Sequence, residues 1–184
     1  MRHGGHRREF SVIQLSVAQL NITIWRIVMK RYVISLLVFF AGFCSATIVS
    51  GGDLMNFVDI PTFFAVGLIP FLFVSVLFGF REMKAAYTTA LQKEPDVDRI
   101  SKSQVFFNTF GTAIWIMGMI GVLNGFVLIL ANMEDKSKLG PNMALALLSI
   151  YHSGVLYLVV VLPFTLLLKK KQKAQSAEKD RGLV

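Results

Sequence analysis

Four long stretches of this sequence contain no Asp, Glu, Lys or Arg. A helix rises about 1.5 Å per residue, so about 20 residues cross the roughly 30 Å of hydrocarbon in a bilayer. The mean hydropathy of the 184-residue chain is +0.60, far above the needs of a soluble core. The sequence therefore predicts an all-α, polytopic membrane protein with four transmembrane helices, two short and two long. They are Tyr32–Gly52, Ile60–Phe80, Ser103–Met133 and Leu139–Leu168.

The basic residues alternate along the chain. Six Lys and Arg precede the first stretch, none separates the first from the second, five precede the third, two precede the fourth and six follow it. Cytoplasmic segments carry such an excess, so we expect a multi-pass protein with both termini and the 81–102 loop in the cytoplasm. Basic residues at membrane edges do not predict nucleic-acid binding. The Lys169–Lys173 run suits anionic membrane lipid, although topology alone explains it.

Three parts follow from this pattern. We expect an N-terminal cytoplasmic or interfacial segment at 1–31, a four-helix transmembrane domain at 32–168 with the short 81–102 loop, and a basic cytoplasmic tail at 169–184. The loop is too small for an independent domain. It contains a helix-favouring stretch, Glu82–Lys93, and a break at Glu94-Pro95-Asp96.

The N-terminal region has two further interpretations. Basic residues, an apolar run and the small residues of Phe43–Ala46 have the layout of a signal peptide, whose cleavage would leave three spans. Before Met29, apolar residues at helical spacing predict an interfacial amphipathic helix, or an extension upstream of a start at Met29.

A short turn joins the first two stretches and predicts an antiparallel hairpin. Gly51-Gly52 is typical of a helix end, and Asp59 before Pro61 is typical of a helix start. We therefore interpret Asp59 as an N-cap and not as an ion ligand.

Catalytic chemistry finds little support. The sequence has no Ser/His/Asp constellation, no zinc-type Cys/His spacing and no phosphate-binding loop, and its three histidines are dispersed. We predict no enzyme activity, no catalytic residue, no metal and no cofactor. Cys44 is the single cysteine, and we interpret it as a small apolar residue. The stretches also hold no carboxylate to relay protons, so a partner must supply the carrier if ions cross here.

Glycines recur on one face of the third stretch. Gly111, Gly118, Gly121 and Gly125 fall within about 80° of one another on a helical wheel. Such a face lets another backbone approach closely, although glycine is frequent in membrane helices in general. We expect helix packing at this face, and we expect leucine at Gly121 to dissociate an oligomer.

Polar residues share a face of the fourth stretch. Ser149, His152 and Ser153 follow the spacing i, i+3, i+4. Pro163 lies further on nearly the same side, and we expect it to take part in helix packing. Polar side chains in lipid face protein or water. We expect an interhelical hydrogen bond for His152 in preference to proton relay. Asn124, on a different face from the glycines, likewise requires a partner.

Three local motifs resemble the MotA/TolQ/ExbB proton-channel superfamily, specifically its four-span MotA-like branch. The segment Gly51–Leu54 with Phe57–Thr62 is similar to that family's GG…F-I-D-I-P-S hairpin. Met117–Gly125 resembles its third-span G-x-x-G-T-V-x-G, and Gly140–Ser153 with Pro163 resembles G-P-x-M-A-x-A-L-L-T-T-L-Y-G and its downstream Pro. Together with the order of two short and two long spans, the motifs cover most of residues 32–168.

The resemblance implies a function. The family forms homopentamers in the bacterial inner membrane around a dimer of MotB/ExbD-like single-span partners, whose membrane Asp carries H⁺ or Na⁺. Ion flow then drives rotation, so the resemblance implies the channel-forming subunit of an ion-driven, stator-like motor; a structural or assembly protein with no ion path is the alternative. Carried over by position, the ion path comprises Val122, Asn124, Ser149, Ile150, His152 and Ser153.

The sequence also departs from the family pattern. Val122 and Ile150 stand where the family commonly has threonines, and His152-Ser153 replaces its Tyr-Gly. The loss of two hydroxyls predicts altered ion choice or loss of conduction. The cytoplasmic loop is much shorter than the one with which flagellar stators engage the rotor, which favours another client for the motor.

Overall fold

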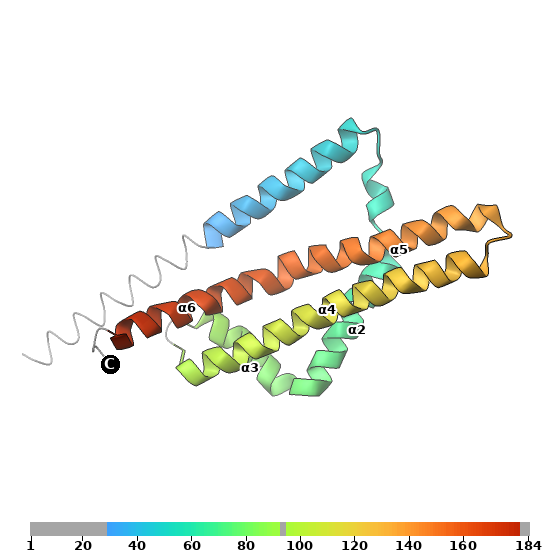
Figure 1. Ribbon diagram of the computed structural model, residues 1–184. Helices are drawn as coiled ribbons and strands as arrows, with labels where there is room; N and C mark the ends of the chain where they lie inside the picture. The colour runs from blue at the N-terminus through green and yellow to red at the C-terminus, as the bar shows by residue number, and fades with distance from the viewer. Residues whose placement is uncertain (1–28, 93–94, 181–184) are drawn as a thin grey trace, which may run out of the picture.

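The computed structural model describes residues 29–92 and 95–180, and this part of the chain is helical throughout, without a strand (Figure 1). Within these residues, four helices are long and apolar enough to cross a membrane: Met29–Val49, Leu54–Phe78, Val97–Ala131 and Lys136–Ala177. The predicted fold class and its four transmembrane helices are therefore confirmed. The amphipathic helix expected before Met29 lies outside the described residues. The signal-peptide interpretation of the first stretch stays a prediction.

The first helix, Met29–Val49, ends in a glycine motif. Gly51 has φ +72, and a glycine adopts this conformation with little steric strain because it has no Cβ. The Gly51 N–H donates to the Ile48 carbonyl (3.0 Å) and the Gly52 N–H to the Thr47 carbonyl (2.9 Å). These two bonds pair carbonyls that the last turn leaves open, as in a Schellman motif.

The hairpin continues through a 3₁₀ turn, η1 (Leu54–Phe57), into α2 (Ile60–Phe78). Asp59 occupies the N-cap position of α2 with extended backbone. Its carboxylate accepts from the Thr62 hydroxyl and not from a backbone amide, so the expected position is found but with a different hydrogen-bond donor. Gly79, with φ +80, then turns the chain into α3 (Phe80–Leu91).

Two long helical rods run side by side through the molecule (Figure 1). The first is α4 (Val97–Ala131) and the second consists of α5 (Lys136–Leu156), the π-helical turn η2 (Tyr157–Val161) and α6 (Leu162–Asp180). Asp135 caps α5 by accepting from the Ser137 amide (3.1 Å). The Ser137 hydroxyl and amide hold the pKa of the Asp135 carboxyl below its ordinary value.

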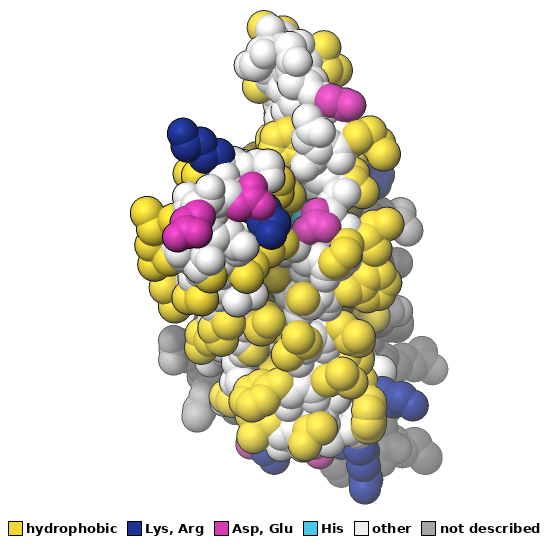
Figure 2. Space-filling view, turned by 90° about the vertical axis from the view of Figure 1, so that its right-hand side faces the viewer, with side chains coloured by type: hydrophobic (Ala, Val, Ile, Leu, Met, Phe, Trp, Pro, Cys, Tyr) yellow, Lys and Arg dark blue, Asp and Glu magenta, His cyan; other side chains and the backbone are white. Residues whose placement is uncertain are grey.

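The ends of the helices are segregated. The start of the first helix, α3 and the end of α6 lie at one end of the molecule, whereas η1 and the α4–α5 turn lie toward the other (Figure 1). The predicted topology places the start of the first span, the 81–102 loop and the end of the fourth span on one side of the membrane, and the identity of that side stays a prediction. Viewed from the α4–α5 turn, hydrophobic side chains cover much of the middle of the face, and acidic and basic groups lie toward its upper part and its lower edge (Figure 2).

Aromatic side chains form the core between α2, α3, α4 and α6. The Phe107 ring is fully buried and stacks on Phe164, with centroids 5.1 Å apart and an interplanar angle of 4°. Tyr87 contacts both rings edge-on, at 5.1 and 5.0 Å. Edge-to-face and stacked pairs of this kind stabilise a core beyond their buried area. This cluster fixes α3 against the two rods.

Lys171 on α6 fastens the end of α3. Its Nζ donates to the carbonyls of Thr89 (3.1 Å), Ala90 (2.7 Å) and Gln92. The last carbonyls of a helix lack partners within it and carry partial negative charge, so a cation is favourable there.

Replacing Lys171 with methionine is expected to loosen the last turn of α3. Methionine keeps the apolar stem but cannot donate, and the lost charge-assisted bonds correspond to on the order of 1 kcal/mol at this half-buried position. Hydrogen exchange of the Thr89–Gln92 amides should accelerate by about fivefold. Lys170→Met, at an exposed neighbour, is the matched control; equal exchange in the two variants would contradict the capping role.

Candidate functional site on the paired long helices

The glycine face of α4 packs against α5 and η2 of the same chain. A Cβ built at Gly118 would lie 2.0 Å from the Ser153 Oγ, and one at Gly121 would lie 2.4 Å from the Ser149 Oγ. At Gly125 it would lie 2.5 Å from the Ala146 Cβ and 2.9 Å from the Ala146 Cα. Gly111 faces the Tyr157 ring. Because the partner helix belongs to the same protomer, the first effect of a side chain at Gly121 falls on this helix pair and not on the oligomer contact expected from the sequence.

The two serines of α5 lie on this contact line. Ser149 is 3% exposed and Ser153 is 0% exposed. Each hydroxyl donates one turn back along its own helix, Ser149 to the Leu145 carbonyl (2.9 Å) and Ser153 to the Ser149 carbonyl (2.8 Å). A serine hydroxyl has two acceptor lone pairs, so both oxygens keep acceptor capacity at the interface.

A groove of about 470 Å³ opens between α2, α4 and α5. Most of its wall is apolar, and three polar side chains face it: Thr62 from α2, Asn124 from α4 and Ser149 from α5. Asn124 is exposed, whereas Thr62 and Ser149 are buried at the helix contacts. The structure thus brings together two of the six predicted ion-path residues, Asn124 and Ser149.

The other four predicted ion-path residues are dispersed. Ser153 lies against Gly118, and His152 is 5% exposed inside the protomer. Ile150 is 39% exposed and Val122 is half-buried. A common path through all six residues therefore stays a prediction.

His152 links α5 to the hairpin. Its Nε2 lies 3.1 Å from the Phe57 carbonyl in η1, and since a carbonyl only accepts, this nitrogen carries the hydrogen. The Nδ1 is buried and has no hydrogen-bond partner among the described residues. Beside it, the centroid of the Tyr151 ring lies 5.5 Å from that of Phe43 and 5.4 Å from that of Phe57. His152 thus makes the kind of interhelical hydrogen bond expected from the sequence.

Two polar residues near these contacts were not predicted. Thr62 lines the groove and donates to Asp59 three residues earlier, a spacing typical of helix N-termini that marks it in the sequence. Tyr32, at the start of the first helix, donates to the Leu158 carbonyl. No sequence signal pairs residues 126 positions apart, so Tyr32 emerges from the structure alone.

A sequence model of the MotA/TolQ/ExbB proton channel family matches residues 80–181, which is more than half of the chain. The chain belongs to the MotA/TolQ/ExbB family. The matched region contains α3, α4, α5, η2 and all of α6, and thus the glycine face and both serines. The α2 wall of the groove and the first helix precede it. Membership identifies a transmembrane protein of a proton-channel family, in agreement with the resemblance found in the sequence.

Curated relatives match shorter segments. The chemotaxis protein PomA of Vibrio alginolyticus is 39% identical over 66 residues, 36% of this chain and 26% of the relative. The uncharacterized protein YtxD of Bacillus subtilis is 37% identical over 78 residues, 42% of this chain and 29% of the relative. Motility protein A of Borreliella burgdorferi is 36% identical over 73 residues, 40% and 28% of the two chains. These MotA/TolQ/ExbB matches thus span less than a third of each relative's length.

Proposed function

We propose that this chain is the channel-forming subunit of an ion-driven membrane motor. In this proposal it assembles as a homopentamer in the bacterial inner membrane around a dimer of MotB/ExbD-like single-span partners, and H⁺ or Na⁺ crosses between the two. Both termini lie in the cytoplasm. Family membership and the names of the relatives, a chemotaxis protein and a motility protein, support this function.

One observation indicates that ion transport by this chain requires a partner. None of the four apolar stretches contains an Asp or Glu. In the described part of the chain, no group of three or more His, Cys, Asp or Glu side chains gathers to bind a metal ion. An ion that crosses hydrocarbon requires a polar or charged carrier, so the proposed carrier is the Asp of the partner's span.

The paired rods suit the wall of such a channel. Asn124 and Ser149 place a carboxamide and a hydroxyl in the groove, where the serine oxygen keeps a lone pair for an ion or its water. Along α4, Leu123, Val127 and Leu130 leave 60 to 66% of their surface exposed, so this helix retains a large apolar face for neighbouring helices.

The decisive test is assembly with the partner. The chain, co-expressed with a neighbouring gene product that has one Asp-bearing span, should purify as a five-to-two complex whose inner wall consists of α4 and α5, as seen by electron cryomicroscopy. A ring of another symmetry, or α4–α5 pairs that face lipid, would contradict the proposal. A sealed, partner-free complex would instead favour the structural or assembly function.

Ser149→Ala is expected to reduce ion flux while the complex stays assembled. The variant removes one acceptor from the groove, and a hydrogen bond of about 1 kcal/mol corresponds to roughly a fivefold slower rate. Flux is measured in vesicles that contain the co-purified complex and a pH- or Na⁺-sensitive dye. Ser45→Ala is the matched control, because the exposed Ser45 hydroxyl also bonds the carbonyl four residues back. Unchanged flux in the Ser149 variant would remove this residue from the path.

A further inference from the structure

The rod that contains α5 and α6 changes its hydrogen-bond register at η2. The Leu162 N–H donates to the Tyr157 carbonyl, five residues earlier. In the same register, the donor for the Leu158 carbonyl is the nitrogen of Pro163. A proline nitrogen carries no hydrogen, so the Leu158 carbonyl has no donor within its own helix in this register.

This position makes an unpaired carbonyl costly. Leu158 lies within the uncharged Leu139–Leu168 stretch, level with Tyr32 at the start of the first stretch. In the hydrocarbon of a bilayer no water pairs with such a group, and every backbone acceptor requires a partner from protein.

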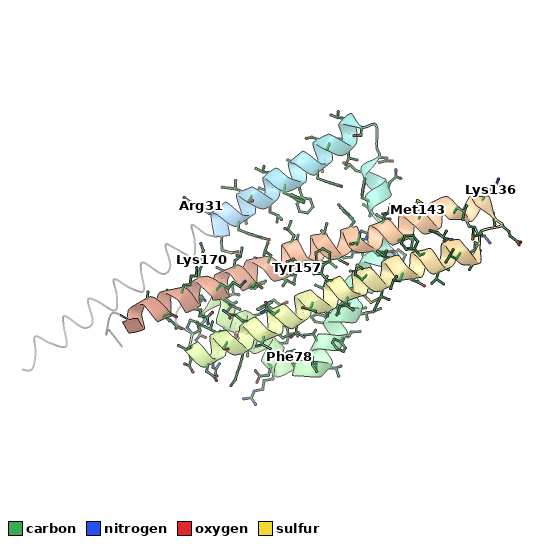
Figure 3. The ribbon with its side chains drawn as sticks, in the orientation of Figure 1. Arg31, Phe78, Lys136, Met143, Tyr157 and Lys170 are labelled. Atoms are coloured by element: carbon green, nitrogen blue, oxygen red, sulfur yellow. The ribbon has the colours of Figure 1, made fainter. Side chains whose placement is uncertain are left out.

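Tyr32 supplies the missing donor. Its hydroxyl donates to the Leu158 carbonyl from the start of the first helix. That helix is otherwise exposed, since none of the residues in its apolar segment is buried. It approaches the α5–α6 rod at its Arg31 end and diverges from the rod toward its other end (Figure 3). Tyr32 follows Arg31 in the sequence and thus belongs to the end of the helix that approaches the rod.

We infer that the Tyr32 hydroxyl has a structural role and donates the hydrogen bond that the nitrogen of Pro163 cannot donate. The bond stabilises the π-helical turn from outside its own helix, and it fastens the first helix to the fourth span. This inference is independent of the proposed function, because it holds whether or not ions cross the protein.

A double-mutant cycle tests the inference. Tyr32→Phe removes only the hydroxyl, and Pro163→Ala restores an N–H that lets the rod pair its own carbonyls. With Pro163 in place, Tyr32→Phe should increase the unfolding rate in detergent about tenfold, as for a buried acceptor that loses its donor. In the Pro163→Ala background, the same change should alter the rate by less than about twofold. Tyr151→Phe, at a tyrosine that stacks its ring on Phe43, is the control and should have little effect in either background.

An equal effect of Tyr32→Phe in both backgrounds, or no effect with Pro163 in place, would overturn the inference. A second measurement does not depend on the Pro163 variant. Spin labels at Val49→Cys and Leu147→Cys, both at exposed positions, report the distance between the first helix and α5 in a Cys44→Ser background. Tyr32→Phe should broaden that distance distribution, whereas an unchanged distribution would show that the hydroxyl does not hold the helix.

Discussion

Gly121→Leu is expected to separate α4 from α5 and to abolish the folded protomer. The space at this glycine is already filled by Ser149, whose Oγ and Cβ would lie 2.4 and 2.5 Å from an added Cβ. Even one extra methyl in a close-packed interior costs about 1–3 kcal/mol, and a leucine adds three more carbons. Thermal unfolding in detergent, followed by circular dichroism, measures the loss. Gly42→Leu is the matched control, because nothing lies within 4 Å of a Cβ at Gly42 in the first helix.

A smaller substitution distinguishes side-chain from backbone contact. Ser149→Gly should restore the stability that Gly121→Ala removes. Without the serine side chain, the nearest atom of residue 149 to the added Cβ is its Cα, at 3.9 Å. Gly125→Ala should resist rescue by Ala146→Gly, because the Ala146 Cα and N remain 2.9 and 3.0 Å away. Rescue at both positions, or at neither, would be inconsistent with the helix contact described above.

Phe107→Ala is expected to have the next largest effect. The ring is 0% exposed and contacts Phe164, Tyr87 and Phe106. Truncation of a buried Phe costs about 3–5 kcal/mol, because a cavity remains where the ring was. Chemical or thermal unfolding should show the loss, together with faster hydrogen exchange in α3. Phe126→Ala on the same helix, where the ring is 54% exposed, is the control. Equal stability of the two variants would show that the aromatic cluster does not hold the rods together.

The helices themselves were predictable from the sequence because the bilayer imposes one requirement, an uncharged apolar segment long enough to cross the hydrocarbon. Any uncharged apolar run of about 20 residues satisfies it, and charge alternation then predicts a topology, which stays a prediction. The face formed by Gly118, Gly121 and Gly125 was predictable for a similar reason, since helical spacing depends on the sequence alone. Its partner was not, because the same flat face suits a helix of this chain or of another copy.

The contacts of the candidate site depend on register between helices, and sequence spacing does not contain that information. His152 was expected to find an interhelical partner, but only the packing of η1 on α5 identifies the Phe57 carbonyl. Asp59 was placed correctly at a helix start, whereas the hydroxyl of Thr62 took the role expected of a backbone amide. Pro163 was expected only to take part in helix packing. A proline in a helix permits a kink, a break or a π-helical turn, and the surrounding side chains decide among them.

The length of α6 has a mechanical consequence. At about 1.5 Å per residue, the 19 residues from Leu162 to Asp180 form an arm of about 28 Å that starts at the irregular turn. A change of about 10° in the bend at that turn would swing the far tip of the arm by about 5 Å. Lys171 bonds this arm to the end of α3. A small change in the bend at η2 would therefore move α3 and the basic Lys169–Lys173 segment sideways together.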